Sequence, residues 1–107
     1  MATPITIIAP IKLAQGKTEA DLLAASNRFQ EEFAGQQAGI LRRELVRKSE
    51  NEYLDIIQFR SEEDALDVIE KEKQSTACHD FFAVMDMSGV ESSDEAIDFY
   101  PSLVTYS

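Results

Sequence analysis

The segment ILRRELVRKSENEYLDIIQFR, residues 40–60, constrains the fold of this chain more than any other part of the sequence. Two strand-like runs flank the polar turn SENE at residues 49–52, a pattern that predicts a β-hairpin. One strand-like and one helix-like segment come before the hairpin, and one helix-like and one strand-like segment come after it. The resulting order β-α-β-β-α-β predicts an α+β, ferredoxin-like sandwich, in which an antiparallel sheet carries two helices on one face.

The size and composition of the chain are those of one compact unit. With 107 residues, of which 44% are hydrophobic, we expect a single domain over 1–107. No apolar run approaches the roughly 20 residues that a membrane-spanning helix needs. The first residues, MATPITIIAP, resemble no export signal, and Cys78 is the single cysteine. We therefore expect a cytoplasmic location and no disulfide.

The charge of the chain is concentrated in its second half. The net charge is −10, and residues 61–107 hold twelve acidic and two basic side chains. Phosphate backbones and anionic membrane surfaces repel such a surface. We therefore expect neither nucleic acid nor membranes as partners, and interpret the acidic half as a solvated face that aids solubility.

The elements before the hairpin have recognisable boundaries. Residues 4–13 alternate in a way that predicts a strand with one fully apolar face. Thr18 and Asp21 form a capping-box pattern at the start of the first helix. The buried stripe of that helix follows helical spacing and consists of Leu22, Ala25, Phe29 and Phe33.

The elements after the hairpin follow the same logic. Ser61 and Asp64 predict a second capping box, and the helix that follows has an apolar side of Ala65, Leu66, Val68 and Ile69. Ser75 and Thr76 interrupt that helix, and a further helical segment ends at Gly89. An acidic loop over 91–95 leads to a last strand over 97–106, which Pro101 confines to a sheet edge or a bulge.

The hairpin strands predict a partner for the sheet. Leu41 and Leu45 share a face with Arg43, and Ile57 shares a face with Asp55, so neither strand alternates cleanly between apolar and polar residues. An antiparallel sheet with one face in water should alternate. Because helices cover only one face, a second copy of the chain is the simplest cover for the other, and we expect a homodimer.

The candidates for chemistry are few. The sequence has no phosphate loop, GxGxxG, CxxC or HExxH motif, and one cysteine with one histidine cannot form a zinc site, so we expect no cofactor and no metal. His79 is the only imidazole and the candidate acid–base catalyst, although a lone histidine is more often a partly exposed or core-edge residue. Cys78 is more easily read as a small buried residue than as a nucleophile.

Besides catalytic residues, the sequence offers candidates for a ligand pocket. Arg43 could hold an anionic ligand, or it could pair with Asp55 across the hairpin. Tyr53, Tyr100 and Tyr106 could donate hydrogen bonds or pack at a sheet edge. The aromatic residues could form core or a ligand-lining wall. The predicted pocket residues are Phe29, Phe33, Arg43, Tyr53, Phe82 and Met85.

Two stretches of the sequence resemble a known family. The hairpin running into IIQFRSEEDALDVIEKEKQS, followed by TACHDFFAVM, is similar to the antibiotic biosynthesis monooxygenase-like domains of the dimeric α+β barrel superfamily. In those domains a strand ending in an aromatic residue leads into an acidic helix and then into a short helix with a histidine before an aromatic pair. Phe59, His79, Phe81 and Phe82 stand at these places, and the likeness covers most of residues 3–106.

The resemblance implies a homodimer of two sheets with a pocket in each subunit between helices and sheet. It also implies cofactor-independent oxidation of a small aromatic or quinone-type molecule, with His79 or a tyrosine handling the proton. Ala9 stands where the haem-degrading branch carries asparagine, and the chain has no tryptophan, so haem degradation is not expected. The alternative is a non-catalytic dimeric module of the same fold that binds a small ligand or serves in a stress response.

Overall fold

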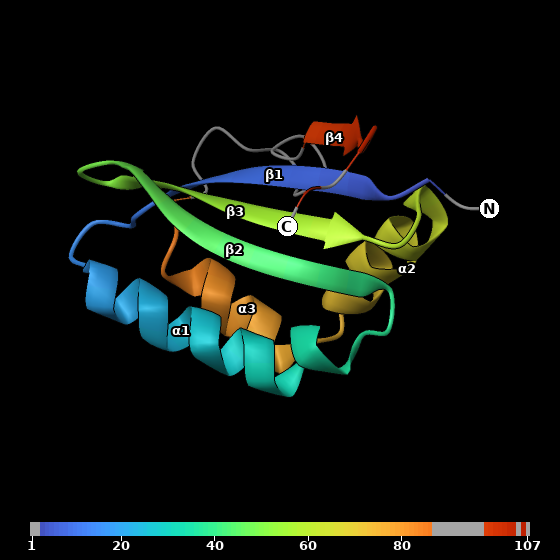
Figure 1. Ribbon diagram of the computed structural model, residues 1–107. Helices are drawn as coiled ribbons and strands as arrows, with labels where there is room; N and C mark the ends of the chain where they lie inside the picture. Colours follow the sequence, from blue (N-terminus) through green and yellow to red (C-terminus); the bar gives the residue numbers. More distant parts are fainter. Residues whose placement is uncertain (1–2, 87–97, 105, 107) are drawn as a thin grey trace.

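The computed structural model of the protein describes residues 3–86, 98–104 and 106. A curved sheet forms one layer, and the helices form a second layer on one side of it (Figure 1). The elements follow one another as β1 (Ile5–Lys12), α1 (Glu19–Glu32), the short 3-10 helix η1 (Ala34–Gln36), β2 (Ile40–Ser49), β3 (Glu52–Phe59), α2 (Glu62–Glu72), α3 (Thr76–Ala83) and β4 (Asp98–Pro101).

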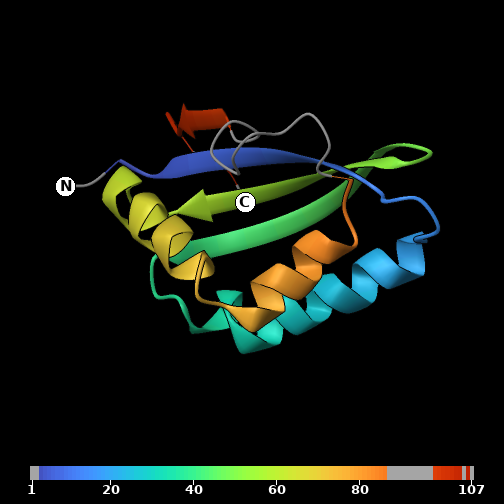
Figure 2. The same ribbon diagram turned by 180° about the vertical axis from the view of Figure 1, so that it is seen from behind.

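The sheet has the topology that the sequence predicts. Its four strands lie in the order β2-β3-β1-β4, and every neighbouring pair is antiparallel. Helices α1 and α3 pack side by side under the sheet, and α2 lies at one end of it, as the view from behind also shows (Figure 2). The ferredoxin-like α+β sandwich is therefore confirmed. No helix among the described residues is long and apolar enough to cross a membrane.

Local capping signals set the helix starts. Thr18 and Asp21 form both halves of a capping box at the start of α1, as predicted. At the start of α2 only one half forms: Ser61 Oγ accepts from the backbone N–H of Asp64, at 3.1 Å. The Asp64 carboxylate instead accepts from Arg60, whose Nε lies 2.7 Å from Oδ2. The predicted second capping box is therefore only half formed, because the Asp64 side chain does not accept a hydrogen bond from the backbone N–H of Ser61.

Three further expectations need correction. Leu66 was expected on the apolar side of α2, but it is 54% exposed, because the buried stripe runs through Ala65, Val68 and Ile69. The last strand was expected over 97–106, but β4 ends at Pro101, since Pro101 pairs with Ile5, the first residue of β1. Pro101 does lie on an edge strand. The helical segment expected to run to Gly89 is also shorter, since α3 ends at Ala83 and Met85 forms a β-bridge with Leu13. The expected start of the last strand at residue 97 and the loop over 91–95 lie outside the described residues.

The two faces of the sheet differ in burial. On the helix-covered face β3 buries alternate residues, namely Tyr53, Asp55, Ile57 and Phe59, against Ile5, Ile7 and Ile11 of β1 and the helices. The register places Ile8, Val46, Leu54 and Ile56 on the opposite face, where all four are partly exposed. No helix among the described residues covers this face, which we call the helix-free face, and its centre is apolar and partly exposed in a single subunit.

Candidate functional site

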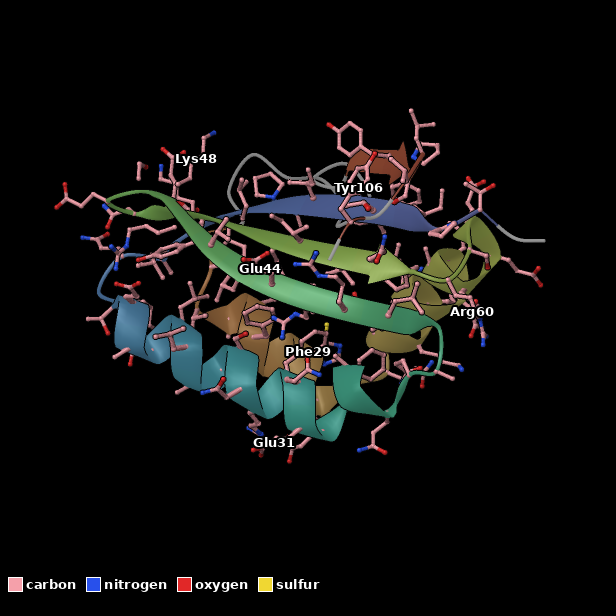
Figure 3. All side chains as sticks on the ribbon, in the orientation of Figure 1. Phe29, Glu31, Glu44, Lys48, Arg60 and Tyr106 are labelled. Atoms are coloured by element: carbon pink, nitrogen blue, oxygen red, sulfur yellow. The ribbon has the colours of Figure 1, made fainter. Side chains whose placement is uncertain are left out.

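An arginine lies buried between the sheet and the helices. Arg43 extends from β2 toward α1 and α3, and its side chain is only 7% exposed. Its guanidinium carbon sits 5.0 Å from the ring centroid of Phe29 and 5.1 Å from that of Phe81. Figure 3 shows Phe29 between α1 and the sheet. The two rings shield the cation from water and attract it through their π-faces.

The charge of Arg43 is compensated within the protein. Its Nε lies 3.1 Å from both carboxylate oxygens of Asp55, whose side chain is 5% exposed. Nη2 donates to Ser26 Oγ at 2.8 Å, and Nη1 donates to the Ser26 carbonyl and to Gln30 Oε1, both at 3.4 Å. Of the two alternatives that the sequence left open for Arg43, the structure shows the pairing with Asp55.

A second carboxylate joins this pair from α2. Glu72 interacts electrostatically with Asp55 and Arg43, and the Cys78 thiol on α3 lowers its pKa slightly. Burial raises the pKa of Glu72 from 4.5 to about 7, with Asp55 adding to the rise and Arg43 opposing it. The same burial, reinforced by Glu72, raises the pKa of Cys78 to about 12, so the thiol stays protonated and unreactive.

We call Ser26, Arg43, Asp55, Glu72 and Cys78 the buried polar cluster. Burial also raises the pKa of Asp55, although Arg43 works against that rise. The cluster thus contains one guanidinium and two carboxyl groups. A single cation can compensate only one carboxylate in a low-dielectric site, so the second one readily keeps its proton. This makes Glu72 the group in the cluster that exchanges a proton near neutral pH.

Aromatic rings connect the cluster to the surface. Phe33 stacks on Phe29 with 5.5 Å between ring centroids, and Phe29 stacks on Phe81 at 5.2 Å. Phe82 continues the row at 6.5 Å from Phe81. At the Phe33 end a shallow groove of about 430 Å³ lies between α1 and the junction of α2 and α3. The groove is lined by Arg28, Glu32, Phe33, Lys71, Gln74, Ser75, Thr76 and Ala77.

The predicted site residues separate into two groups. Phe29, Phe33 and Arg43 lie together around the cluster and its aromatic row. Tyr53 is buried farther along the sheet, opposite Arg47. Phe82 and Met85 pack, partly buried, against the core, and Met85 forms a β-bridge with Leu13. A place for Phe82 and Met85 in the wall of a ligand pocket stays a prediction.

His79 lies apart from the cluster. Its ring is exposed on α3, and Nε2 lies 3.0 Å from the backbone carbonyl of Lys73. The next residue, Asp80, forms an ion pair with Arg28 of α1. A catalytic role for His79 stays a prediction, since it would require a substrate bound on the outer side of α3.

Two residues of the cluster, Ser26 and Glu72, carried sequence signals that the pattern analysis did not use, whereas Asp55 was already recognised as a possible partner of Arg43. Ser26 lies at helical spacing between Leu22 and Phe29, and Glu72 continues the spacing of Val68 and Ile69. Asp55 alternates with apolar residues on the buried face of β3. A polar residue at a buried position of an amphipathic element was the signal that could have found each of them.

Comparison with solved structures identifies the class of fold. Its neighbours include antibiotic biosynthesis monooxygenase-like proteins, so the resemblance seen in the sequence is confirmed at the level of the fold. Two crystal structures of SnoaB from Streptomyces nogalater, a cofactor-independent oxygenase, match with TM-scores of 0.72 and 0.71 at 15% identity, covering 97% of each chain.

Two more solved structures match this chain over nearly the full length of both proteins. A proposed antibiotic biosynthesis monooxygenase from Chloroflexus aurantiacus matches at TM-score 0.66 and 12% identity, over 98% of both chains. Another from Caulobacter crescentus matches at TM-score 0.66 and 16% identity, over 96% of this chain and 92% of that one. No family model matches this sequence. No curated protein matches it either.

Proposed function

We propose that this protein is a cofactor-independent oxidising enzyme that acts on a small aromatic or quinone-type molecule. The observation that carries the proposal is the buried polar cluster, whose Arg43 lies against the two middle rings of a row of stacked phenylalanines. Flat apolar rings suit an aromatic substrate, and the cluster combines a cation with a carboxyl that titrates near neutral pH. The fold shared with SnoaB supports the same activity.

The chemistry needs little beyond a base and a shielded site. A phenolic or benzylic proton is removed, and the resulting carbanion donates electrons to dioxygen and forms a peroxide. The peroxide then loses water and leaves a carbonyl, so that one substrate and one dioxygen give one quinone-type product and one water. A guanidinium held among aromatic rings stabilises the anionic stages electrostatically.

A non-catalytic ligand-binding module is the second candidate, and one observation favours it. The donors of Arg43 already bind Asp55, Ser26 and Gln30, so a ligand would have to compete with these internal partners. In that case the fold would bind a small aromatic molecule without converting it.

Oxygen uptake separates the two candidates. Anthrone serves as the probe for the oxygen-inserting reaction that releases water, and reduced menadione as a probe for the two-electron oxidation that releases hydrogen peroxide; both are used at neutral pH, and the uncatalysed rate is subtracted. We expect wild-type protein to consume dioxygen with at least one probe, in proportion to protein concentration, and His79→Ala to show whether the exposed histidine contributes. Saturable binding of the oxidised quinone without any oxygen uptake would favour the module, and equal rates for wild type and His79→Ala would argue against a catalytic histidine.

We also propose that the active form is a homodimer joined through the helix-free face. Ile8, Val46, Leu54 and Ile56 give that face an apolar centre without a helix over it. Beyond β4, Leu103 and Tyr106 are exposed apolar residues, at 97% and 86%. Figure 3 shows Tyr106 on the side of the sheet away from Phe29. An exposed apolar surface of this kind is typical of an interface.

Sedimentation tests the dimer directly. The subunit mass is 12.0 kDa, and we expect twice that mass for wild type at micromolar concentration. Ile56→Glu places a charge on the helix-free face and should yield monomers. Leu66→Glu makes the same kind of change on the exposed side of α2 and should stay dimeric. A monomeric wild type would contradict the proposal.

A further inference from the structure

The edge strand of the hairpin carries two opposite charges on the helix-free face. The register pairs Arg42 with Gln58 and Glu44 with Ile56, and residues directly opposite each other in an antiparallel ladder share a face. Nη2 of Arg42 lies 2.8 Å from Oε1 of Glu44, and the two side chains are 56% and 53% exposed. Both charges are therefore accessible to another molecule.

This pair borders the apolar centre of the face. Ile56 lies opposite Glu44, and Val46, the next residue of β2 on this face, lies opposite Leu54. These three apolar side chains are partly exposed in a single subunit. A partner that covers them meets the two charges at the border, where charges decide orientation and partner choice more than they add affinity.

The charge distribution of the chain favours a second copy at this border. The net charge is −10, so two copies repel each other at long range, and the excess falls in residues 61–107 with twelve acidic and two basic side chains. The hairpin differs, because residues 40–52 hold four basic and three acidic side chains. Two copies therefore approach each other with least repulsion through their hairpins.

A two-fold axis makes the pair complementary to itself. In an isologous dimer one patch meets the same patch of the other copy, so that residue i contacts residue j and j contacts i. Two β2 strands that cross in opposite directions over position 43 bring each Arg42 opposite the Glu44 of the other copy. This arrangement forms two ion pairs between the subunits and brings no like charges together.

We propose that the Arg42–Glu44 pair recognises the same pair on a second copy and thereby sets the orientation of a two-fold dimer. The inference rests on the proposed homodimer and assigns its charge contacts. A guanidinium has five N–H donors, and within the described part of the chain Arg42 forms one ion pair, with Glu44. It therefore retains donors for a carboxylate of the other copy.

Charge reversal followed by mixing tests this recognition. Arg42→Glu alone, or Glu44→Arg alone, brings like charges together at both contacts. We expect each variant to raise the Kd of the dimer at low salt by about 10-fold or more, and high salt to reduce this effect. An equal mixture of the two variants should associate like wild type, because the two negative side chains of one then face the two positive side chains of the other. Sedimentation measures the Kd, and circular dichroism confirms that each variant is folded.

The double variant Arg42→Glu/Glu44→Arg keeps an opposite-charge pair within each chain and decides the question should a single variant fold poorly. It should dimerise with itself like wild type and yet not mix with wild type, because like charges would meet at both contacts of a mixed dimer. Energy transfer between amino-terminal labels measures the mixing. The matched control reverses Lys71 and Asp67, an exposed ion pair of α2 at 3.0 Å, and should mix freely with wild type.

The outcomes separate this recognition from the homodimer itself. Weakened single variants that recover on mixing, together with a double variant that excludes wild type, support it. Single variants that dimerise like wild type, single variants that stay weak after mixing, or a double variant that mixes freely with wild type overturn the recognition and leave the homodimer intact. A monomeric wild type overturns the homodimer, and the recognition with it.

Discussion

The carboxyl of Glu72 makes the stability of this protein depend on pH, and Glu72→Gln is expected to remove most of that dependence. Folding raises the pKa of Glu72 from 4.5 to about 7. Because one pKa unit corresponds to about 1.4 kcal/mol, ionisation of Glu72 opposes folding by roughly 3 kcal/mol once it is complete. The carboxyl is partly exposed, so screening by water reduces the effect we expect to measure to about 2 kcal/mol.

The sign follows from where the proton is held. Below pH 4.5 the carboxyl is protonated in the folded and the unfolded chain, so it costs nothing. Between pH 4.5 and about 7 the unfolded chain releases the proton while the folded protein keeps it, and the free energy of unfolding falls as the pH rises. Glutamine stays neutral, so Glu72→Gln should match wild type in acid and exceed it at alkaline pH.

Urea unfolding followed by far-ultraviolet circular dichroism measures this difference. Wild type, Glu72→Gln and the surface control Glu63→Gln are unfolded at about pH 5 and about pH 8, with protein concentration held constant because association contributes to stability. Asp55 interacts with Glu72, so the difference between wild type and Glu72→Gln includes the loss of this interaction. The reasoning is refuted if Glu72→Gln and wild type differ by the same free energy at both pH values.

Two other changes test the packing around the site and the sheet. Arg43→Met leaves the buried carboxylate of Asp55 without its cation and should lower the free energy of unfolding in urea by about 3–5 kcal/mol. The control Arg42→Met removes an exposed ion pair and should lower it by less than about 1 kcal/mol. Equal losses would mean that the Arg43–Asp55 pair is not buried in solution. Gly39→Ala brings a Cβ within 2.7 Å of the Cβ of Asp64, so the first turn of α2 must shift, and thermal unfolding should show a loss of about 1–3 kcal/mol. An unchanged Tm would show that the two segments do not approach so closely.

Much of this fold can be predicted from the sequence because its boundaries depend on local signals. The Thr18 capping box and the helix break predicted at 75–76 involve residues a few positions apart; the box appears in the structure, and the break lies at 73–75, with Ser75 as the N-cap of α3 and Thr76 as its first residue. The end of β4 depends instead on a distant strand, because the ladder with β1 ends at the Ile5–Pro101 pair and, among the described residues, only one backbone hydrogen bond, from Ser102 N–H to the Pro4 carbonyl, follows it. A strand pattern that continues to residue 106 therefore overstates the length of β4, whose end at Pro101 is fixed by tertiary structure.

The site was less accessible to sequence reasoning, for a related reason. The sequence of the two hairpin strands indicated that Arg43 and Asp55 could pair. Only the packing of the helices reveals that Phe29 and Phe81 enclose the guanidinium. Glu72 meets its neighbours through contacts between α2, β2, β3 and α3, which no spacing along the chain encodes. Its one local sign is an acid that continues the buried stripe of α2.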